Sequence, residues 1–191
     1  MPDRPSAGPA HPRDCTSCGT NAAATELPDG ILDAERQRYR RHFDVNLAAP
    51  TLLMRALAER LIERGAAGGR VVNISTDSAR AFPGQVFYGT SKTALEATTR
   101  AAATELGPHG ITVNAVAPGP VQTGWIDDTL PNQVLPSIPL RRLGTPDDFA
   151  QAVAFLLSDA TPWITGRSSR SQGDMRSNLD QAGRMPSLGD R

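Results

Sequence analysis

The hydrophobic positions along the chain alternate between helical and strand spacing. A helical stretch is predicted near residues 33–45, a longer one follows Pro50, where apolar residues recur with helical spacing, and a third is expected near residues 85–106. Residues 70–75 and 111–116 are short β-branched runs, which are typical of buried parallel strands. A helix that opens with acidic side chains is predicted over 147–157, followed by a weak last strand that begins at Trp163-Ile-Thr-Gly166.

This order of elements predicts the fold class. Strand, helix, strand, helix and strand at these lengths indicate an α/β fold, with a parallel sheet, right-handed crossovers and helices on both faces. In such sheets the ligand site lies beyond the carboxyl ends of the strands. The side chains that directly follow Ile74 and Val116 are therefore the first candidates for a functional site.

The two ends of the chain lack this pattern. Residues 1–19 are rich in proline and poor in large apolar side chains, and residues 172–191 are polar and rich in glycine. Such segments cannot bury enough surface to offset the entropy of ordering, so both are expected to be disordered tails around a structured part at 20–171. Cys15 and Cys18 have no second cysteine pair, so they are expected to be incidental thiols, and no metal site is predicted.

Composition narrows the classes of function. Hydrophobic residues make up 39% of the chain, and 20 acidic residues balance 20 basic ones. Zero net charge gives no electrostatic reason to expect nucleic acid or an anionic membrane as a partner. The sequence contains no apolar run of transmembrane length, and its N-terminus has no secretory core, so a cytoplasmic protein is predicted. His42 and His109 have no partner pattern and are expected on the surface.

Three side chains suggest acid–base chemistry. Tyr88 and Lys92 are four residues apart and so share one face of a predicted helix, while Ser75 follows a predicted strand. Lys92 is the only lysine among the 20 basic residues, which suggests a position where arginine is not equivalent. An ammonium lowers the pKa of a neighbouring phenol, and a serine hydroxyl could hold a carbonyl oxygen beside it. A lone Tyr-x-x-x-Lys would more often be a helix-start aromatic and a surface charge.

Further landmarks resemble a known family. Ser75 followed by Tyr88-Gly-Thr-Ser-Lys92 is similar to the active site of classical short-chain dehydrogenases/reductases, and Asn46 matches the asparagine of their tetrad. The resemblance runs from about residue 19 to 178 and is closest to the 3-oxoacyl-[acyl-carrier-protein] reductase-like group. The other ordered landmarks are Asn73-Ile-Ser, Thr20-Asn-Ala-Ala, Asn114-Ala-Val-Ala-Pro118-Gly119 with Thr123, Arg142-Leu-Gly-Thr-Pro-Asp-Asp, and Trp163-Ile-Thr-Gly166.

The resemblance implies a partial Rossmann-type, doubly wound parallel sheet and hydride transfer between NAD or NADP and a small carbonyl or alcohol substrate. Tyr88 would be the general acid or base, and Ser75 would hydrogen-bond the substrate oxygen. Lys92 would bind the nicotinamide ribose and lower the pKa of the phenol, and Asn46 would hold a water that links Lys92 to solvent. The implied cofactor contacts are Asn21, Ala22, Tyr88, Lys92, Pro118, Gly119, Val121 and Thr123.

One family landmark is not found in the sequence. Members open with a strand and a glycine-rich turn whose backbone amides hold the pyrophosphate, and this chain carries no such turn. The resemblance therefore implies an N-terminally truncated member whose sheet lacks its first strands. Residues 14–20 read poorly as β, so even the strand before Asn21 is expected to be lost. NAD versus NADP and the identity of the substrate are not readable from this sequence.

Three functions stay open. The first is an NAD(P)-dependent oxidoreductase, favoured by the complete tetrad. The second is a non-catalytic subunit that forms a homo-oligomer or pairs with a full-length relative, because the resemblance places the family's dimer interface on helices at about 47–64 and 86–106. The third is a degenerate product without a folded role. The lack of the glycine-rich turn favours the second and third.

Overall fold

A computed structural model describes residues 15–66, 68–80, 83–124, 126 and 135–170. Within these residues four strands form one sheet in the order β1-β2-β3-β4, and every neighbouring pair is parallel. The predicted α/β fold with a parallel sheet is therefore confirmed. The strands are β1 (Ser17–Thr20), β2 (Gly69–Ile74), β3 (Ile111–Ala117) and β4 (Ser168–Arg170).

The helices agree with the predicted stretches to within a few residues. The first stretch is helix α1 (Arg36–Phe43), which runs through a π-helical turn (Asp44–Ala48) into α2 (Ala49–Glu63). The later helices are α3 (Val86–Leu106) and α5 (Pro146–Leu157). Short 3-10 turns lie at Ile31–Asp33, Asp77–Arg80, Gly107–His109 and Leu135–Ser137.

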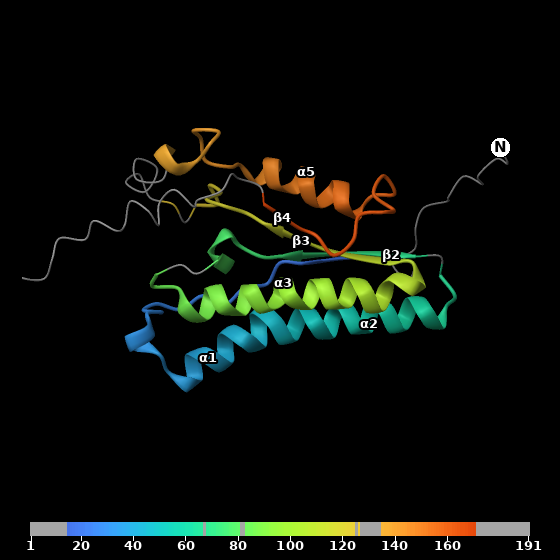
Figure 1. Ribbon diagram of the computed structural model, residues 1–191, viewed down its shortest axis with the longest axis horizontal. Helices are drawn as coiled ribbons and strands as arrows, with labels where there is room; N and C mark the ends of the chain where they lie inside the picture. Colours follow the sequence, from blue (N-terminus) through green and yellow to red (C-terminus); the bar gives the residue numbers. More distant parts are fainter. Residues whose placement is uncertain (1–14, 67, 81–82, 125, 127–134, 171–191) are drawn as a thin grey trace, which may run out of the picture.

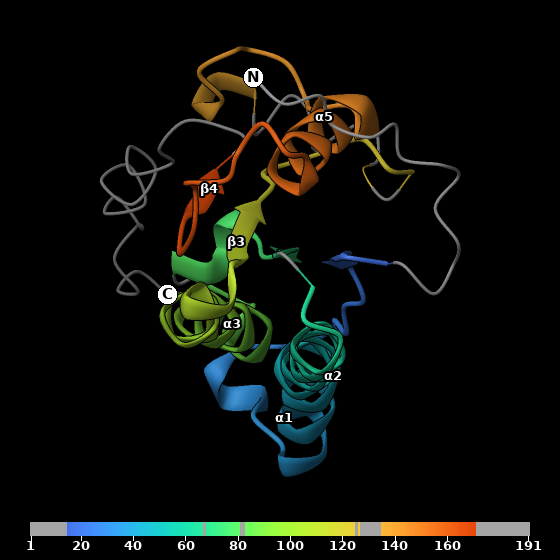
Figure 2. The same ribbon diagram turned by 90° about the vertical axis from the view of Figure 1, so that its right-hand side faces the viewer.

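Helices cover both faces of the sheet. Helices α2 and α3 lie side by side under one face, and α5 crosses the other (Figures 1 and 2). Alternate side chains of the central strands follow this division, because strand residues point to opposite faces. Val71 and Val113 pack in a cluster with Met54 and Leu61 of α2, whereas Val72, Ile74 and Val116 pack with Leu156 of α5.

The crossovers do not all have the same hand. The strand order advances in one direction from β1 to β4, and all strands are parallel. Helix α3 connects β2 to β3 across one face, while α5 connects β3 to β4 across the opposite face (Figure 2). The two connections therefore have opposite hands. The expectation of right-handed crossovers throughout, which rests on a strong general preference, is wrong here.

Two strand predictions are also corrected. β1 occupies residues that were expected to belong to a disordered tail, and its register with β2 runs from Ser17 opposite Arg70 to Thr20 opposite Asn73. Backbone pairing with β2 and a buried hydrogen bond from Thr20 Oγ1 to Asn73 hold this strand, so its small side chains gave no periodic signal. β4 begins later than expected, because Trp163 is 96% exposed and Gly166 turns the chain at φ 70° before the polar run Ser168–Arg170. The other predicted tail residues, 1–14 and 172–191, lie outside the described residues.

Three loops begin side by side at the carboxyl ends of the strands. Asn21, Ser75 and Pro118 directly follow the carboxyl ends of β1, β2 and β3, as expected for the ligand edge of a parallel sheet. In the described segments, no helix is long and apolar enough to cross a membrane. The same segments hold no group of three or more histidine, cysteine, aspartate or glutamate side chains placed to bind a metal ion.

Candidate functional site

Lys92 lies one helical turn after Tyr88 on α3, and its side chain is directed inward. The residue is 2% exposed, and Nζ donates a 2.8 Å hydrogen bond to the carbonyl oxygen of Ile74 at the end of β2. Burial disfavours the charged ammonium and lowers the pKa of Lys92 to about 8. Such an amine exchanges its proton much closer to neutral pH than an ordinary lysine does.

Tyr88 stands in the first turn of α3 and is half-buried. Its pKa is raised above the ordinary 10.0, first because burial disfavours the phenolate and also because the Asp77 carboxylate is near. A hydrogen bond with the Thr76 side chain acts in the opposite direction and lowers this pKa. The lowering of the Tyr88 pKa that was expected from Lys92 stays a prediction.

Ser75 and Thr76 follow β2 directly, but their hydroxyls have different partners. Ser75 is 2% exposed, and its Oγ donates a 2.8 Å hydrogen bond to Oε1 of Glu96 on α3. The other carboxylate oxygen of Glu96 lies 3.7 Å from Nη2 of Arg170 at the end of β4. The hydroxyl of the adjacent Thr76 donates a 3.3 Å hydrogen bond to Oδ1 of Asp77.

Asn46 sits in the π-helical turn between α1 and α2 and is completely buried. Its Oδ1 accepts a 2.7 Å hydrogen bond from the backbone N–H of Ala24, and its Nδ2 donates to the Ala24 carbonyl at 2.9 Å. Nδ2 also lies 3.0 Å from Oγ of Ser91, which itself donates to the Tyr88 carbonyl at 2.8 Å. Asn46 thereby ties the loop after β1 to the helix that carries Tyr88. Its predicted contact with a water stays a prediction.

Asp29 supports the start of α3 from a distant part of the chain. The backbone N–H groups of Phe87 and Tyr88 donate to its two carboxylate oxygens at 2.9 and 3.0 Å, and Val86 N donates to its carbonyl at 2.8 Å. These are N–H groups of a first helical turn, which have no partner within the helix. A carboxylate at this end also complements the helix dipole. Sequence reasoning missed Asp29 because no local capping pattern marks a partner this far away.

The position of His42 is another correction to the sequence analysis. It was expected on the surface, as exposed His109 is, but it is completely buried. Its Nδ1 lies 2.8 Å from the Arg38 carbonyl oxygen, and its Nε2 accepts a 3.3 Å hydrogen bond from Glu26 N. With both ring nitrogens paired to backbone, His42 fastens the loop after β1 to α1.

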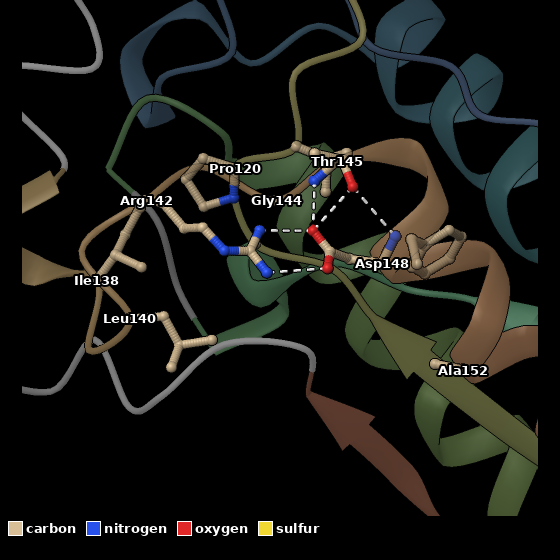
Figure 3. A pocket seen from close by; sticks show the side chains of 11 residues that line it. Pro120, Ile138, Leu140, Arg142, Gly144, Thr145, Asp148 and Ala152 are labelled. Atoms are coloured by element: carbon tan, nitrogen blue, oxygen red, sulfur yellow. Dashed lines mark hydrogen bonds and ion pairs between the residues drawn. The ribbon is translucent and has the colours of Figure 1, made fainter.

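Most of the residues predicted to contact a cofactor line one of two separate cavities. Asn21, Ala22 and Lys92 line a cavity of about 260 Å³ between β1, α2 and α3. Gly119 and Val121 line another of about 280 Å³ between the loop after β3 and α5 (Figure 3). Tyr88, Pro118 and Thr123 line neither cavity; Pro118 instead accepts a 3.1 Å hydrogen bond from Asp77 N, and Thr123 is exposed. Trp125, a predicted lid or packing residue, lies outside the described residues.

An ion pair shapes one wall of the second cavity. Arg142 donates to both carboxylate oxygens of Asp148, at 2.6 and 2.9 Å, next to the apolar side chains of Ile138 and Leu140 (Figure 3). This pairing and the hydrogen bonds from Thr145 hold the pKa of Asp148 well below its usual range. Thr145 and Asp148 also form a capping box at the start of α5. The landmark Arg142-Leu-Gly-Thr-Pro-Asp-Asp therefore forms the start of α5.

Comparisons with known proteins agree with this geometry. A family profile described as enoyl-(acyl carrier protein) reductase matches residues 17–173. Dehydrogenase/reductase SDR family member 4 of Homo sapiens is 35% identical over 166 residues, which cover 84% of this chain and 59% of that protein. The chain belongs to the short-chain dehydrogenase/reductase family. Its further likeness to 3-oxoacyl-[acyl-carrier-protein] reductases stays a prediction.

Other members of this family show the same partial coverage. An uncharacterized oxidoreductase, YjdA, of Bacillus subtilis is 38% identical over 154 residues, or 80% of this chain and 61% of that protein. A solved 4-hydroxyisoleucine dehydrogenase complexed with NADH superposes with a TM-score of 0.75 at 30% identity, covering 81% of this chain and 66% of the other. The chain thus spans about three fifths of the length of YjdA and of the human relative.

Proposed function

We propose that the chain is the proton-transferring and nicotinamide-facing part of an NAD(P)-dependent short-chain dehydrogenase/reductase that interconverts a carbonyl and an alcohol. The main support is the position of Tyr88 and buried Lys92, one turn apart on α3 at the carboxyl edge of the sheet. Membership of the family and the NADH bound in a related dehydrogenase support the same chemistry.

Each residue has a defined task in this proposal. Tyr88 gives a proton to the carbonyl oxygen during reduction and takes it back during oxidation, so it needs a hydroxyl partner that fixes the direction of its O–H bond. The sequence-predicted partner is Ser75, and Thr76 is the second candidate. Lys92 returns the proton to Tyr88, which its pKa near 8 suits. Asn46 holds the helix that carries both in place.

The residues present fit one side of a nicotinamide dinucleotide. Lys92 lines the same cavity as Asn21 and Ala22, so an amine and the loop after β1 are available together for ribose hydroxyls. Gly119 and Val121 would line the nicotinamide from the loop after β3, with Pro118 and Thr123 beside them. The cofactor, NAD or NADP, would supply the hydride when bound.

Turnover by the purified chain tests this proposal. The chain is incubated with NADH or NADPH and a panel of small ketones and aldehydes, and cofactor oxidation is followed by absorbance. We expect oxidation that depends on the carbonyl and falls at least a hundredfold in Tyr88→Phe, because the phenolic proton is lost. Tyr39→Phe is the matched control and should keep full activity, since Tyr39 stacks on Phe43 and lines neither of the two cavities. Equal turnover by wild type and Tyr88→Phe would refute the assigned role.

A second candidate function is a subunit that pairs with another copy or with a full-length relative. The observation that favours it is the exposure of large apolar side chains on α2, where Leu52 is 60%, Leu53 52% and Ile62 45% exposed. Light scattering of wild type and of Leu52→Glu with Ile62→Lys tests it, with Leu140→Glu as the control at an exposed leucine elsewhere. Self-association that only the α2 variants abolish would support pairing. A monomer in all three would count against pairing of like copies.

A further inference from the structure

The first turn of α3, which carries Tyr88, is held by one residue of the loop after β1. The first N–H groups of a helix have no partner within it. In α3 these groups donate to Asp29, Val86 to its carbonyl oxygen at 2.8 Å, and Phe87 and Tyr88 to its carboxylate oxygens at 2.9 and 3.0 Å. Asp29 therefore supports the helix at the turn where proton transfer is proposed.

The sequence beside α3 supplies no cap of its own. Gln85 occupies the N-cap position, and its side chain makes no hydrogen bond to the start of the helix. The first N–H group with a helical partner is that of Gly89, which donates to the Gln85 carbonyl at 2.8 Å. The dependence on Asp29 is mutual, because Asp29 is 3% exposed and a buried carboxylate is strongly destabilised without hydrogen bonds.

We propose that Asp29 is a positioning residue that fixes where the Tyr88 phenol stands. Asp29 holds the N–H group of Tyr88, while the Tyr88 carbonyl accepts a 2.8 Å hydrogen bond from Oγ of Ser91. That oxygen accepts in turn from Nδ2 of Asn46 at 3.0 Å. The backbone of Tyr88 is thus held on both sides by side chains that lie outside its own turn or come from other elements. The inference rests on the proposed function only for its effect on turnover, and not for the position of the phenol.

Tyr88 depends on this support more than Lys92 does. The phenol hydroxyl stands at the far end of its side chain, so a small rotation of the first turn is magnified there. Misplacing a reacting group by about 1 Å can cost about a hundredfold in rate. Lys92 has an anchor of its own, because its Nζ donates to the Ile74 carbonyl at 2.8 Å. Loss of the Asp29 carboxylate should therefore move Tyr88 and leave Lys92 in place.

The composition of the chain allows a direct test. There are two tyrosines, so in a Tyr39→Phe background the resonance of ring-labelled tyrosine and the phenolate absorbance both report Tyr88 alone. We expect Asp29→Ala to move the Tyr88 ring resonance and to lower the midpoint of its ionisation toward the ordinary 10.0, because a looser first turn exposes the phenol to water. Asp29→Asn, which keeps one acceptor oxygen, should have a smaller effect.

Hydrogen exchange shows whether the effect is local. In Asp29→Ala the backbone amide of Tyr88 should exchange about tenfold faster or more, while that of Ala103, near the other end of α3, keeps its rate. Equal acceleration of both amides would overturn the inference, because Asp29 would then act on the stability of the whole chain and not on the position of Tyr88.

The matched control is Asp33→Ala, at an exposed aspartate of the same connection, which should leave the Tyr88 signals unchanged. A ring resonance and an ionisation midpoint that Asp29→Ala leaves unchanged would overturn the inference; Asp29→Asn decides by the same criteria if the alanine variant does not fold by circular dichroism. These readouts need neither cofactor nor substrate, so they decide it even if the chain turns over no carbonyl. Where turnover is seen, Asp29→Ala should lower kcat about tenfold or more and change the KM for the cofactor less than about threefold. A loss confined to KM would also overturn it.

Discussion

Strands β3 and β1 belong to the same sheet but differ in how they are held. Every residue of β3 is buried, whereas only the last residue of β1 is, and β1 pairs with β2 alone among the described strands. Side chains pack on both faces of the sheet at β2 and β3, while β1 is held mainly by backbone bonds and a few long polar contacts. Tyr88 and Lys92 lie on α3, but the cavity that Lys92 lines also includes Gly19 and Thr20 of β1. The candidate site therefore joins the well-packed region to the edge strand.

Asn73 should give the largest effect, because it joins the two regions. It is completely buried, accepts from Thr20 Oγ1 at 2.8 Å, and donates to Thr99 Oγ1 at 2.9 Å and to Met54 Sδ at 3.3 Å. Asn73→Leu should lower the free energy of unfolding by about 3 kcal/mol, because hydroxyls on β1 and α3 lose their partner. Denaturant unfolding measures this. The same replacement at exposed Asn21 should change stability by about 0.5 kcal/mol or less, and equal effects would contradict the account.

Lys92 should make stability depend on pH. Its pKa is about 8 in the folded chain and 10.5 ordinarily, so between these values the unfolded chain binds more protons. The free energy of unfolding of wild type relative to Lys92→Met should therefore rise with pH from about 8 to 10.5, by roughly 2 to 3 kcal/mol. Arg55→Met, at an exposed position, should show no such rise, because arginine does not titrate in this range. A flat difference for Lys92→Met would show that its ammonium is not desolvated.

Alanine substitutions at two glycines, one in β2 and one in β1, should give the smallest difference in stability and are closely matched. A methyl group added at Gly69, in β2, would lie 2.5 Å from Leu61 Cδ1 and 3.2 Å from the Thr16 carbonyl oxygen, whereas one at Gly19, in β1, would meet nothing within 4 Å. Gly69→Ala should destabilise the chain by about 1 to 2 kcal/mol through overpacking. Gly19→Ala should be neutral or stabilise it by about 0.5 kcal/mol. Equal melting temperatures for the two variants would contradict the contrast between packed and open strands.

The sequence predicted the packed region better than the edge. β-branched runs at residues 70–75 and 111–116 required burial on both faces, and the structure places β2 and β3 there. β1 and β4 were misplaced because small polar side chains carry no periodic signal when a strand is held mainly by backbone pairing. The opposite hand of the α5 crossover could not be predicted from the sequence, because the general rule favours right-handed crossovers.

Within the site, the sequence predicted which residues take part better than it predicted which partners they contact. Tyr88 and Lys92 share α3, as their spacing indicated, and Asn46, which the resemblance suggested, is connected to that helix through Ser91. The partners that fix them come from far away in sequence, as with Asp29 and the start of α3 or Glu96 and Ser75. Only the folded arrangement resolves such contacts, because several rotamers of one sequence satisfy the same spacing.

Calorimetric titration of the purified chain with NADH and NADPH tests the central claim, that a working nicotinamide-facing half-site exists here. We predict saturable binding that weakens at least tenfold in Lys92→Ala, because the amine in the cavity with Asn21 and Ala22 is lost. Arg100→Ala, which removes an exposed cation from the same helix, should leave binding unchanged. Binding that Lys92→Ala does not affect, or no binding up to millimolar concentration, would contradict the account.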